Sequence, residues 1–171
     1  MNLDFASVWE MIADLVPEND ALICGEEIIS WKEYDSRSSK IASALTKAGL
    51  RANSKAGLYL NNSNEYLIGQ NAIFKIGGIP INVNYRYVEE ELIYLLKNSD
   101  AEAVFYHACY SLRINEIAKS LPNIKAWIEV SDGTESKFSK SLKYENLLDQ
   151  HSEMERIHRD PETIYMLYTG G

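Results

Sequence analysis

A short apolar run, Ala56-Gly57-Leu58-Tyr59-Leu60, leads through a helical segment to a second apolar run, Ile79-Pro80-Ile81-Asn82-Val83. The polar residues 61–64 can begin the helix, and Gly77-Gly78 can end it. A strand, a helix and a second strand at this spacing indicate a right-handed crossover between parallel strands. This stretch therefore predicts an α/β fold built on a parallel sheet.

The same alternation continues toward the C-terminus. Three glutamates open the segment 89–98 and suit the positive end of a helix dipole. Repeated strands and helices predict a mostly parallel sheet with helices on both faces. The expected elements are strands over 103–106 and 124–130, helices over 111–121 and 142–148, and an exposed polar loop over 131–141.

The first fifty residues predict a helix, a hairpin and a second helix. Ser7 and Glu10 fit a capping box, and Pro17 marks the end of the first helix. The hairpin comprises the apolar runs 21–24 and 28–31 around Gly25-Glu26-Glu27. Ser30 begins the second helix, which ends at Gly49.

Composition restricts the function classes. The chain has 171 residues, of which 46% are hydrophobic, which suits one domain with a sizeable core. Lysine and arginine number 17 against 25 acidic residues, and the net charge of -8 disfavours nucleic acid or an anionic membrane as a partner. We expect no transmembrane segment and a cytoplasmic location, because residues 1–4 do not begin a signal peptide and no apolar run reaches membrane-spanning length.

The two cysteines, Cys24 and Cys109, lie far apart and have no cysteine or histidine at metal-ligand spacing. We interpret both as small buried hydrophobic residues in a reducing compartment. The three histidines, His107, His151 and His158, are also scattered, and we expect surface or loop positions for them. The sequence thus predicts no metal site.

The chain closes with Thr163-Ile164-Tyr165-Met166-Leu167-Tyr168-Thr169-Gly170-Gly171. Its apolar residues predict a buried strand, and its glycines predict a tight turn. Such a strand and loop can present converging backbone N–H groups to a phosphate, although an ordinary turn is the more common arrangement. An apolar strand this close to the end also suggests a chain cut within a core element.

Together these segments resemble the N-terminal part of adenylate-forming enzymes, the AMP-binding superfamily of acyl-CoA synthetases, luciferases and peptide-synthetase adenylation domains. The resemblance follows the chain in order over nearly its whole length and favours the acyl-CoA synthetase branch. It is carried by residues 9–13, Pro17, 21–23, 29–34, 64–66, 74–82, 84–87 and 91–92, and by Tyr168-Thr169-Gly170-Gly171, which matches the first part of the family's phosphate loop.

The resemblance implies that residues 1–171 are a partial N-terminal AMP-binding domain that ends within the phosphate-binding loop. Tyr168, Thr169, Gly170 and Gly171 would bind the ATP phosphates, with backbone N–H groups acting at Gly170, where the family most often has serine. We expect no catalytic residue and no metal ligand in this chain. The parent enzyme would use ATP, Mg²⁺ and coenzyme A to activate a carboxylic acid, such as a fatty acid, and the isolated chain would be inactive.

Two other interpretations remain. The chain can be a stand-alone doubly wound module that binds a small molecule without catalysis. It can also be a ubiquitin-like or sulfur-carrier protein with an adenylated Gly-Gly end, but Tyr165 to Tyr168 are too apolar for a free tail.

Several other residues have simple structural interpretations. Glu89, Glu90 and Glu91 fit a solvated first helical turn. Lys75 and Arg86 fit positions of the family, yet they also fit cations paired at the edge of the sheet. We expect five aromatic residues to pack in the core or against helices: Tyr66, Tyr85, Tyr87, Tyr94 and Trp127.

Overall fold

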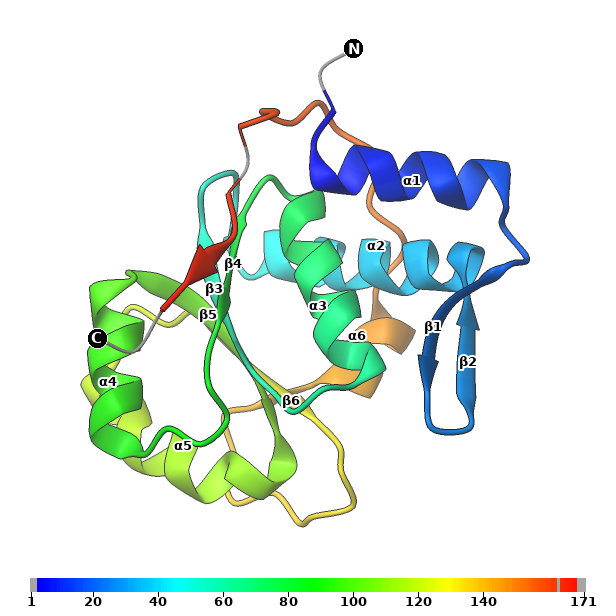
Figure 1. The fold of residues 1–171 in the computed structure, drawn as a ribbon. Helices are drawn as coiled ribbons and strands as arrows, with labels where there is room; N and C mark the ends of the chain where they lie inside the picture. The colour runs from blue at the N-terminus through cyan, green and yellow to red at the C-terminus, as the bar shows by residue number, and fades with distance from the viewer. Residues whose placement is uncertain (1–2, 163, 169–171) are drawn as a thin grey trace.

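The computed structural model describes residues 3–162 and 164–168. Its main element is a six-stranded sheet with the order β7-β6-β5-β3-β4-β8 (Figure 1). All neighbouring pairs in this sheet are parallel, which confirms the predicted α/β fold. The strands are β3 (Lys55–Tyr59), β4 (Ile79–Asn82), β5 (Ala101–His107), β6 (Ala126–Val130), β7 (Leu142–Lys143) and β8 (Met166–Leu167).

Before the sheet comes the predicted helix, hairpin and helix. These are α1 (Phe5–Leu15), β1 (Asp20–Cys24), β2 (Glu27–Ser30) and α2 (Trp31–Lys47). Ser30 caps α2 through Glu33 N, as predicted. The predicted start of α1 is wrong: the helix begins earlier, because the Asp4 carboxylate accepts a hydrogen bond from Ser7 N and so caps its first turn.

Helices connect the strands and cover both faces of the sheet (Figure 1). The segment 108–120 is divided into two 3₁₀ turns around a short helix, rather than forming the single helix expected over 111–121. Residues 142–143 extend the sheet beside Ile128 and Glu129, so the helix predicted from 142 begins only at Tyr144. The elements are α3 (Asn64–Lys75), α4 (Glu89–Asn98), η1 (Ala108–Tyr110), α5 (Ser111–Ile117), η2 (Ala118–Ser120) and α6 (Tyr144–Gln150).

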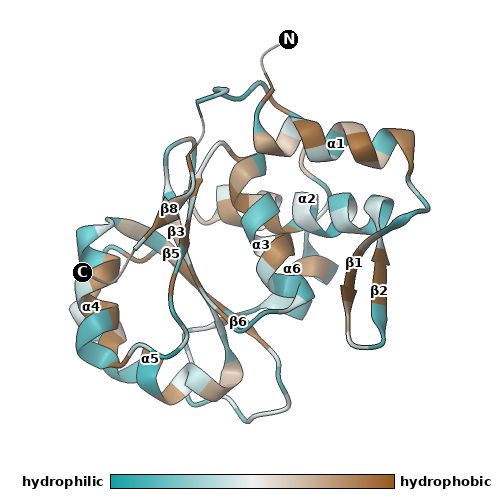
Figure 2. Ribbon diagram, in the orientation of Figure 1, coloured by the Kyte–Doolittle hydropathy of each residue, from teal (hydrophilic) through white to brown (hydrophobic). Residues whose placement is uncertain are grey.

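The sheet separates two apolar cores, because side chains alternate between the faces of each strand. The first lies under α2, α3 and α6 and includes Leu58 and Phe105. The second lies under α4 and α5 and includes Tyr59 and Tyr106. In Figure 2 the central strands of the sheet are largely brown (hydrophobic), and the helices around them carry both brown and teal (hydrophilic) residues. In the described part of the chain, no helix is long and apolar enough to cross a membrane.

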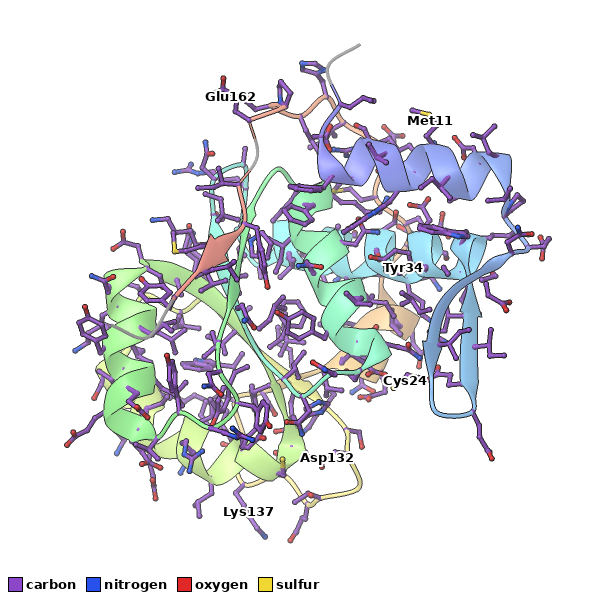
Figure 3. The ribbon with its side chains drawn as sticks, viewed as in Figure 1. Met11, Cys24, Tyr34, Asp132, Lys137 and Glu162 are labelled. Carbon is purple, nitrogen blue, oxygen red and sulfur yellow. The ribbon has the colours of Figure 1, made fainter. Side chains whose placement is uncertain are left out.

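Two predictions of burial are wrong. β8 is an edge strand paired only with β4 in the described sheet, and the Leu167 side chain is 59% exposed instead of buried. Cys24 and Cys109 are both exposed. Cys24 is the last residue of β1, next to the turn of the hairpin (Figure 3), and Cys109 lies in η1.

Candidate functional site

A hollow of about 610 Å³ lies beyond the carboxyl ends of β3 and β4, next to the end of β8. Open parallel sheets bind ligands beyond the carboxyl ends of their strands, so this is the place where a site is expected. Its walls combine amide side chains with aromatic rings. The lining residues are Leu60, Asn62, Tyr66, Asn82, Val83, Asn84, Tyr85, Tyr87 and Tyr168.

A hydrogen-bonded chain of three side chains crosses one wall of the hollow. The Tyr66 hydroxyl on α3 donates to Asn82 Oδ1 at 2.9 Å and lies 2.8 Å from the Tyr165 hydroxyl. Burial raises the pKa of Tyr66 above its ordinary value, and its hydrogen bond with Tyr165 acts in the same direction. These contacts join α3 to the ends of β4 and β8.

The loop 84–88 forms the opposite wall, and Arg113 on α5 holds it. Arg113 Nη1 donates to the Tyr59 hydroxyl at 2.7 Å and to the Tyr87 carbonyl at 3.2 Å, and Nε donates to Glu89 at 2.9 Å. Tyr59 in turn donates to the Tyr87 carbonyl. One guanidinium therefore fastens the loop both to the sheet and to α4.

The loop also has an internal turn. Asn84 Oδ1 accepts from Arg86 N at 3.0 Å, and the Asn84 carbonyl accepts from Tyr87 N at 3.0 Å. The Arg86 guanidinium lies 5.4 Å from the centre of the Tyr85 ring. This turn places Tyr85 and Tyr87 at the hollow.

The predicted phosphate-binding residues are only partly described. Tyr168 lines the hollow, packs on the second core and donates from its hydroxyl to Asn98 Oδ1 at 2.7 Å. Thr169, Gly170 and Gly171 lie outside the described residues. The structure therefore places the entrance to the expected loop beside the hollow, and the binding role of Tyr168 to Gly171 stays a prediction.

Some single-residue predictions are confirmed. The first turn of α4 is polar, with Glu90 and Glu91 exposed and Glu91 accepting from Val88 N. Trp127 is buried against Phe138. Tyr66 and Tyr87 are partly buried beside the two cores.

Other single-residue predictions are wrong. Tyr85 and Tyr94 are 41% and 66% exposed instead of packed, because they lie on the outside of the loop and of α4. His107 is buried, because it is the last residue of the central strand β5 rather than part of a loop. Lys75 is buried under the helices, 1% exposed, instead of lying at the edge of the sheet.

Sequence reasoning missed the environment of Lys75, which we call the charge cluster (Asp4, Glu10, Asp35, Lys75 and Arg159). Lys75 Nζ lies 2.8 Å from Glu10 and 2.6 Å from Asp35. Arg159 binds Asp4 at 3.0 Å and also binds Glu10. These partners lie up to 155 positions apart, so no local pattern could have identified them. The one sign of the charge cluster in the sequence was Glu10, an acidic residue within the apolar stripe of α1.

No group of three or more potential metal ligands occurs among the histidines, cysteines and acidic residues that the structure describes. Two acids of the first turn of α4 already have partners: Glu89 pairs with Arg113, and Glu91 accepts a hydrogen bond from Val88 N. We therefore assign no Mg²⁺ ligand to a described residue.

The chain is similar to known proteins over its whole length. A family model described as "AMP-binding enzyme" matches residues 9–171. A 3-oxocholest-4-en-26-oate–CoA ligase of Rhodococcus rhodochrous is 38% identical over 100% of this chain and 31% of its own length. A medium/long-chain-fatty-acid–CoA/3-oxocholest-4-en-26-oate–CoA ligase of Mycobacterium marinum is 34% identical over 99% of this chain and 32% of its own length.

A solved structure has the same fold. The anthranilate CoA ligase AuaEII, crystallised with anthranoyl-AMP, superposes with a TM-score of 0.85 at 20% identity, over 99% of this chain and 32% of its own. The chain therefore spans about a third of the length of the relatives that it matches.

Proposed function

Because this chain belongs to the AMP-binding enzyme family, we propose that it forms the N-terminal part of an ATP-dependent acyl-CoA synthetase. The observation that carries the proposal is the similarity to acyl-CoA ligases along the entire chain, at up to 38% identity. The hollow at the carboxyl ends of β3 and β4, which Tyr168 lines just after β8, supports it. In this proposal residues 1–171 are a partial N-terminal domain that ends within the phosphate-binding loop.

The proposed reaction has two steps. A carboxylate oxygen of the acid bonds to the α-phosphorus of ATP, the bond from that phosphorus to the bridging oxygen breaks, and pyrophosphate leaves. The thiol sulfur of coenzyme A then attacks the acyl carbonyl, the carbon–oxygen bond to AMP breaks, and the thiol proton is released. The first step makes a poor acyl donor into a good one, and it depends on positioning and charge more than on a nucleophilic side chain.

The role of this chain in that reaction is to hold nucleotide. We propose that backbone N–H groups at Thr169 to Gly171 bind the ATP phosphates, and that Tyr168 sets where this loop begins through its bond to Asn98. Mg²⁺ would accompany ATP as its counter-ion. No described residue is assigned a step in bond making or breaking.

We propose an apolar carboxylic acid as substrate. The relatives named for their substrates act on medium- and long-chain fatty acids or on a sterol-derived acid. Fatty acid metabolism in the cytoplasm is the setting that fits such a substrate.

The test is ATP–pyrophosphate exchange by the full-length polypeptide that carries residues 1–171, with acids from acetate to long-chain fatty and sterol-derived carboxylates. We expect exchange with an apolar acid, and its loss when Gly171 is replaced by valine, because a side chain there would keep the phosphates from the backbone. The 171-residue chain alone should give no exchange. Exchange by the chain alone, or none by the full-length protein with any acid, would contradict the proposal.

The sequence that follows Gly171 in the full-length polypeptide provides an independent test of the proposed family branch. The resemblance predicts that the residues after Gly171 continue as Thr-Thr-Gly and then Pro-Lys-Gly. If instead the chain alone folds, binds a small ligand and has no such continuation, the interpretation as a stand-alone binding module is correct.

A further inference from the structure

Residues 151–162, between α6 and β8, have no regular secondary structure, yet side-chain and backbone groups of three helices hold them. We call this stretch the connecting segment; Figure 1 shows it running past the N-terminal end of α1 before the chain turns into β8, and Figure 3 labels Glu162 near that turn. Met154 N donates to the Ser39 carbonyl on α2 at 3.2 Å. Arg156 binds Asp14 on α1 with two bonds of 2.6 and 2.8 Å.

Arg159 makes the buried attachment of this segment. Its side chain is 1% exposed, and its guanidinium is shared among three elements. Nε donates to Asp4 Oδ1 at 3.0 Å, Nη2 donates to Glu10 and to Ser7 Oγ at 3.3 Å, and Nη1 donates to the Lys75 carbonyl at 3.2 Å. A planar guanidinium with five N–H groups can make this set of contacts, and an ammonium group cannot reproduce its geometry.

The contact with the Lys75 carbonyl attaches the connecting segment to the C-terminal end of α3. A cation there also interacts favourably with the helix dipole. The other end of α3 carries Tyr66, whose hydroxyl bonds to Tyr165 just before β8. The same helix therefore holds the chain at two points before β8, at Arg159 and at Tyr165.

The attachments at Arg159 and Tyr165 limit how far this part of the chain can move. Tyr66 and Lys75 are about 14 Å apart along the axis of α3 at 1.5 Å per residue, and the six steps from Arg159 to Tyr165 can span at most roughly 20 Å when fully extended. Without the Arg159 contacts, the start of β8 would be held by the contact between Tyr66 and Tyr165 and, in the described sheet, by pairing with β4.

We infer that Arg159 is a positioning residue for β8 and for Tyr168, the first residue of the proposed phosphate-binding loop. It sets where β8 begins along α3, and so where Tyr168 lies beside the hollow. It acts through Tyr165 and Tyr168 and does not touch nucleotide. The consequence for ATP rests on the proposed function, whereas the effect on β8 does not.

Hydrogen exchange on the 171-residue chain tests the effect on β8 without any ligand. For Arg159→Met we expect the amides of residues 164–168 to exchange at least about tenfold faster, while those of β3 and β5 are unchanged. Arg159→Lys should give an intermediate rate, since it keeps the charge but not the three-way contact. The matched control is Arg156→Met on the same segment, where the side chain is 44% exposed and we expect less than about a twofold change.

If Arg159 only stabilised the fold as a whole, Arg159→Met would change amide hydrogen exchange in all strands together or in none. Either pattern would overturn the inference. If Arg159→Met does not fold, Tyr165→Phe removes the second attachment while leaving the charge cluster intact. We expect the same local increase in residues 164–168 from that variant, and unchanged exchange there would also overturn the inference.

Steady-state kinetics of the full-length polypeptide separate this inference from the proposed function. With ATP as the varied substrate, Arg159→Lys should raise KM for ATP about threefold to tenfold and leave KM for the acid unchanged, because the change is confined to β8 and Tyr168. An equal effect on both KM values would overturn the link between Arg159 and the loop. Absence of activity in the unsubstituted protein would instead contradict the proposed function, with the exchange result on β8 still standing.

Discussion

The hydroxyl of Tyr66, near the start of α3, lies 2.8 Å from the hydroxyl of Tyr165, which precedes β8 by one residue. The two residues are 99 positions apart, and their contact joins the centre of the chain to its last described strand. Since β8 pairs with only one strand in the described sheet, side-chain contacts of this kind contribute much of what holds it in place.

Removing the Tyr66 hydroxyl tests the contribution of this contact to stability. Tyr66→Phe should lower the free energy of unfolding by about 1 kcal/mol or somewhat more, because Asn82 and Tyr165 both lose their partner. Urea denaturation followed by circular dichroism measures the change. Tyr94→Phe is the matched control, since Tyr94 is 66% exposed, and it should have no measurable effect.

Alkaline pH should destabilise the protein through its buried tyrosines. Burial raises the pKa of Tyr34, Tyr66, Tyr106 and Tyr144 above the ordinary value of 10.0, so the folded state keeps their protons where the unfolded state has lost them. The stability is fully present below about pH 10 and decreases as the pH rises above it. The part of the absorbance change at 295 nm that comes from these four buried tyrosines should therefore coincide with the change in circular dichroism at high pH. Ionisation of all tyrosines well before unfolding would contradict this.

Arg113 should be important for the loop 84–88. Arg113→Met removes the bonds to Tyr59, the Tyr87 carbonyl and Glu89, and we expect a loss of about 1.5–3 kcal/mol because the guanidinium is charged and partly covered. Faster hydrogen exchange over residues 84–88 should accompany the loss. Arg86→Met, in the same loop but exposed, should change stability by less than about 0.5 kcal/mol.

The charge cluster should be sensitive to the loss of one member. Lys75→Met leaves Glu10 and Asp35 without their shared cation and should cost about 3–5 kcal/mol. The double variant Lys75→Met with Glu10→Gln should recover part of that loss in urea denaturation. Lys32→Met is the control, because Lys32 and Glu18 form a pair that is 73% and 79% exposed, and we expect at most about 1 kcal/mol. Equal effects at Lys32 and Lys75 would show that burial does not matter here.

Both cysteines should react with a thiol reagent in the folded protein, since both are exposed. Burial of its sulfur and the neighbouring Asp132 raise the pKa of Cys109 to about 11, so its thiolate is scarce at neutral pH. In a Cys24→Ser variant, labelling of Cys109 should be slow at pH 8 and rise about tenfold per pH unit until about pH 11. Asp132→Asn should accelerate it at pH 8. Labelling only after unfolding would contradict the observed exposure.

Local chemistry accounts for what could be predicted. The alternation of apolar strands and amphipathic helices determines a parallel sheet with two covered faces. Short stretches such as 56–60 and 79–83 are enough to identify strands, because the spacing of apolar residues and the length of the apolar run are local properties of the sequence. Cap residues were right where they act within one turn, as at Ser30. The predicted cap at Ser7 was wrong, because the Asp4 carboxylate accepts the hydrogen bond from Ser7 N and so begins the helix earlier.

Tertiary structure decided the rest. Whether an apolar strand is buried depends on its neighbours in the sheet, which is why Leu167 is exposed although its segment is as apolar as β4. The partners of Lys75 and Arg159 come from helices and segments far apart in the chain, and the contact between Tyr66 and Tyr165 exists only because α3 lies beside β8. The sequence by itself thus determined the elements and their order, because these depend on neighbouring residues, whereas the charge cluster and the walls of the hollow depend on packing between distant ones.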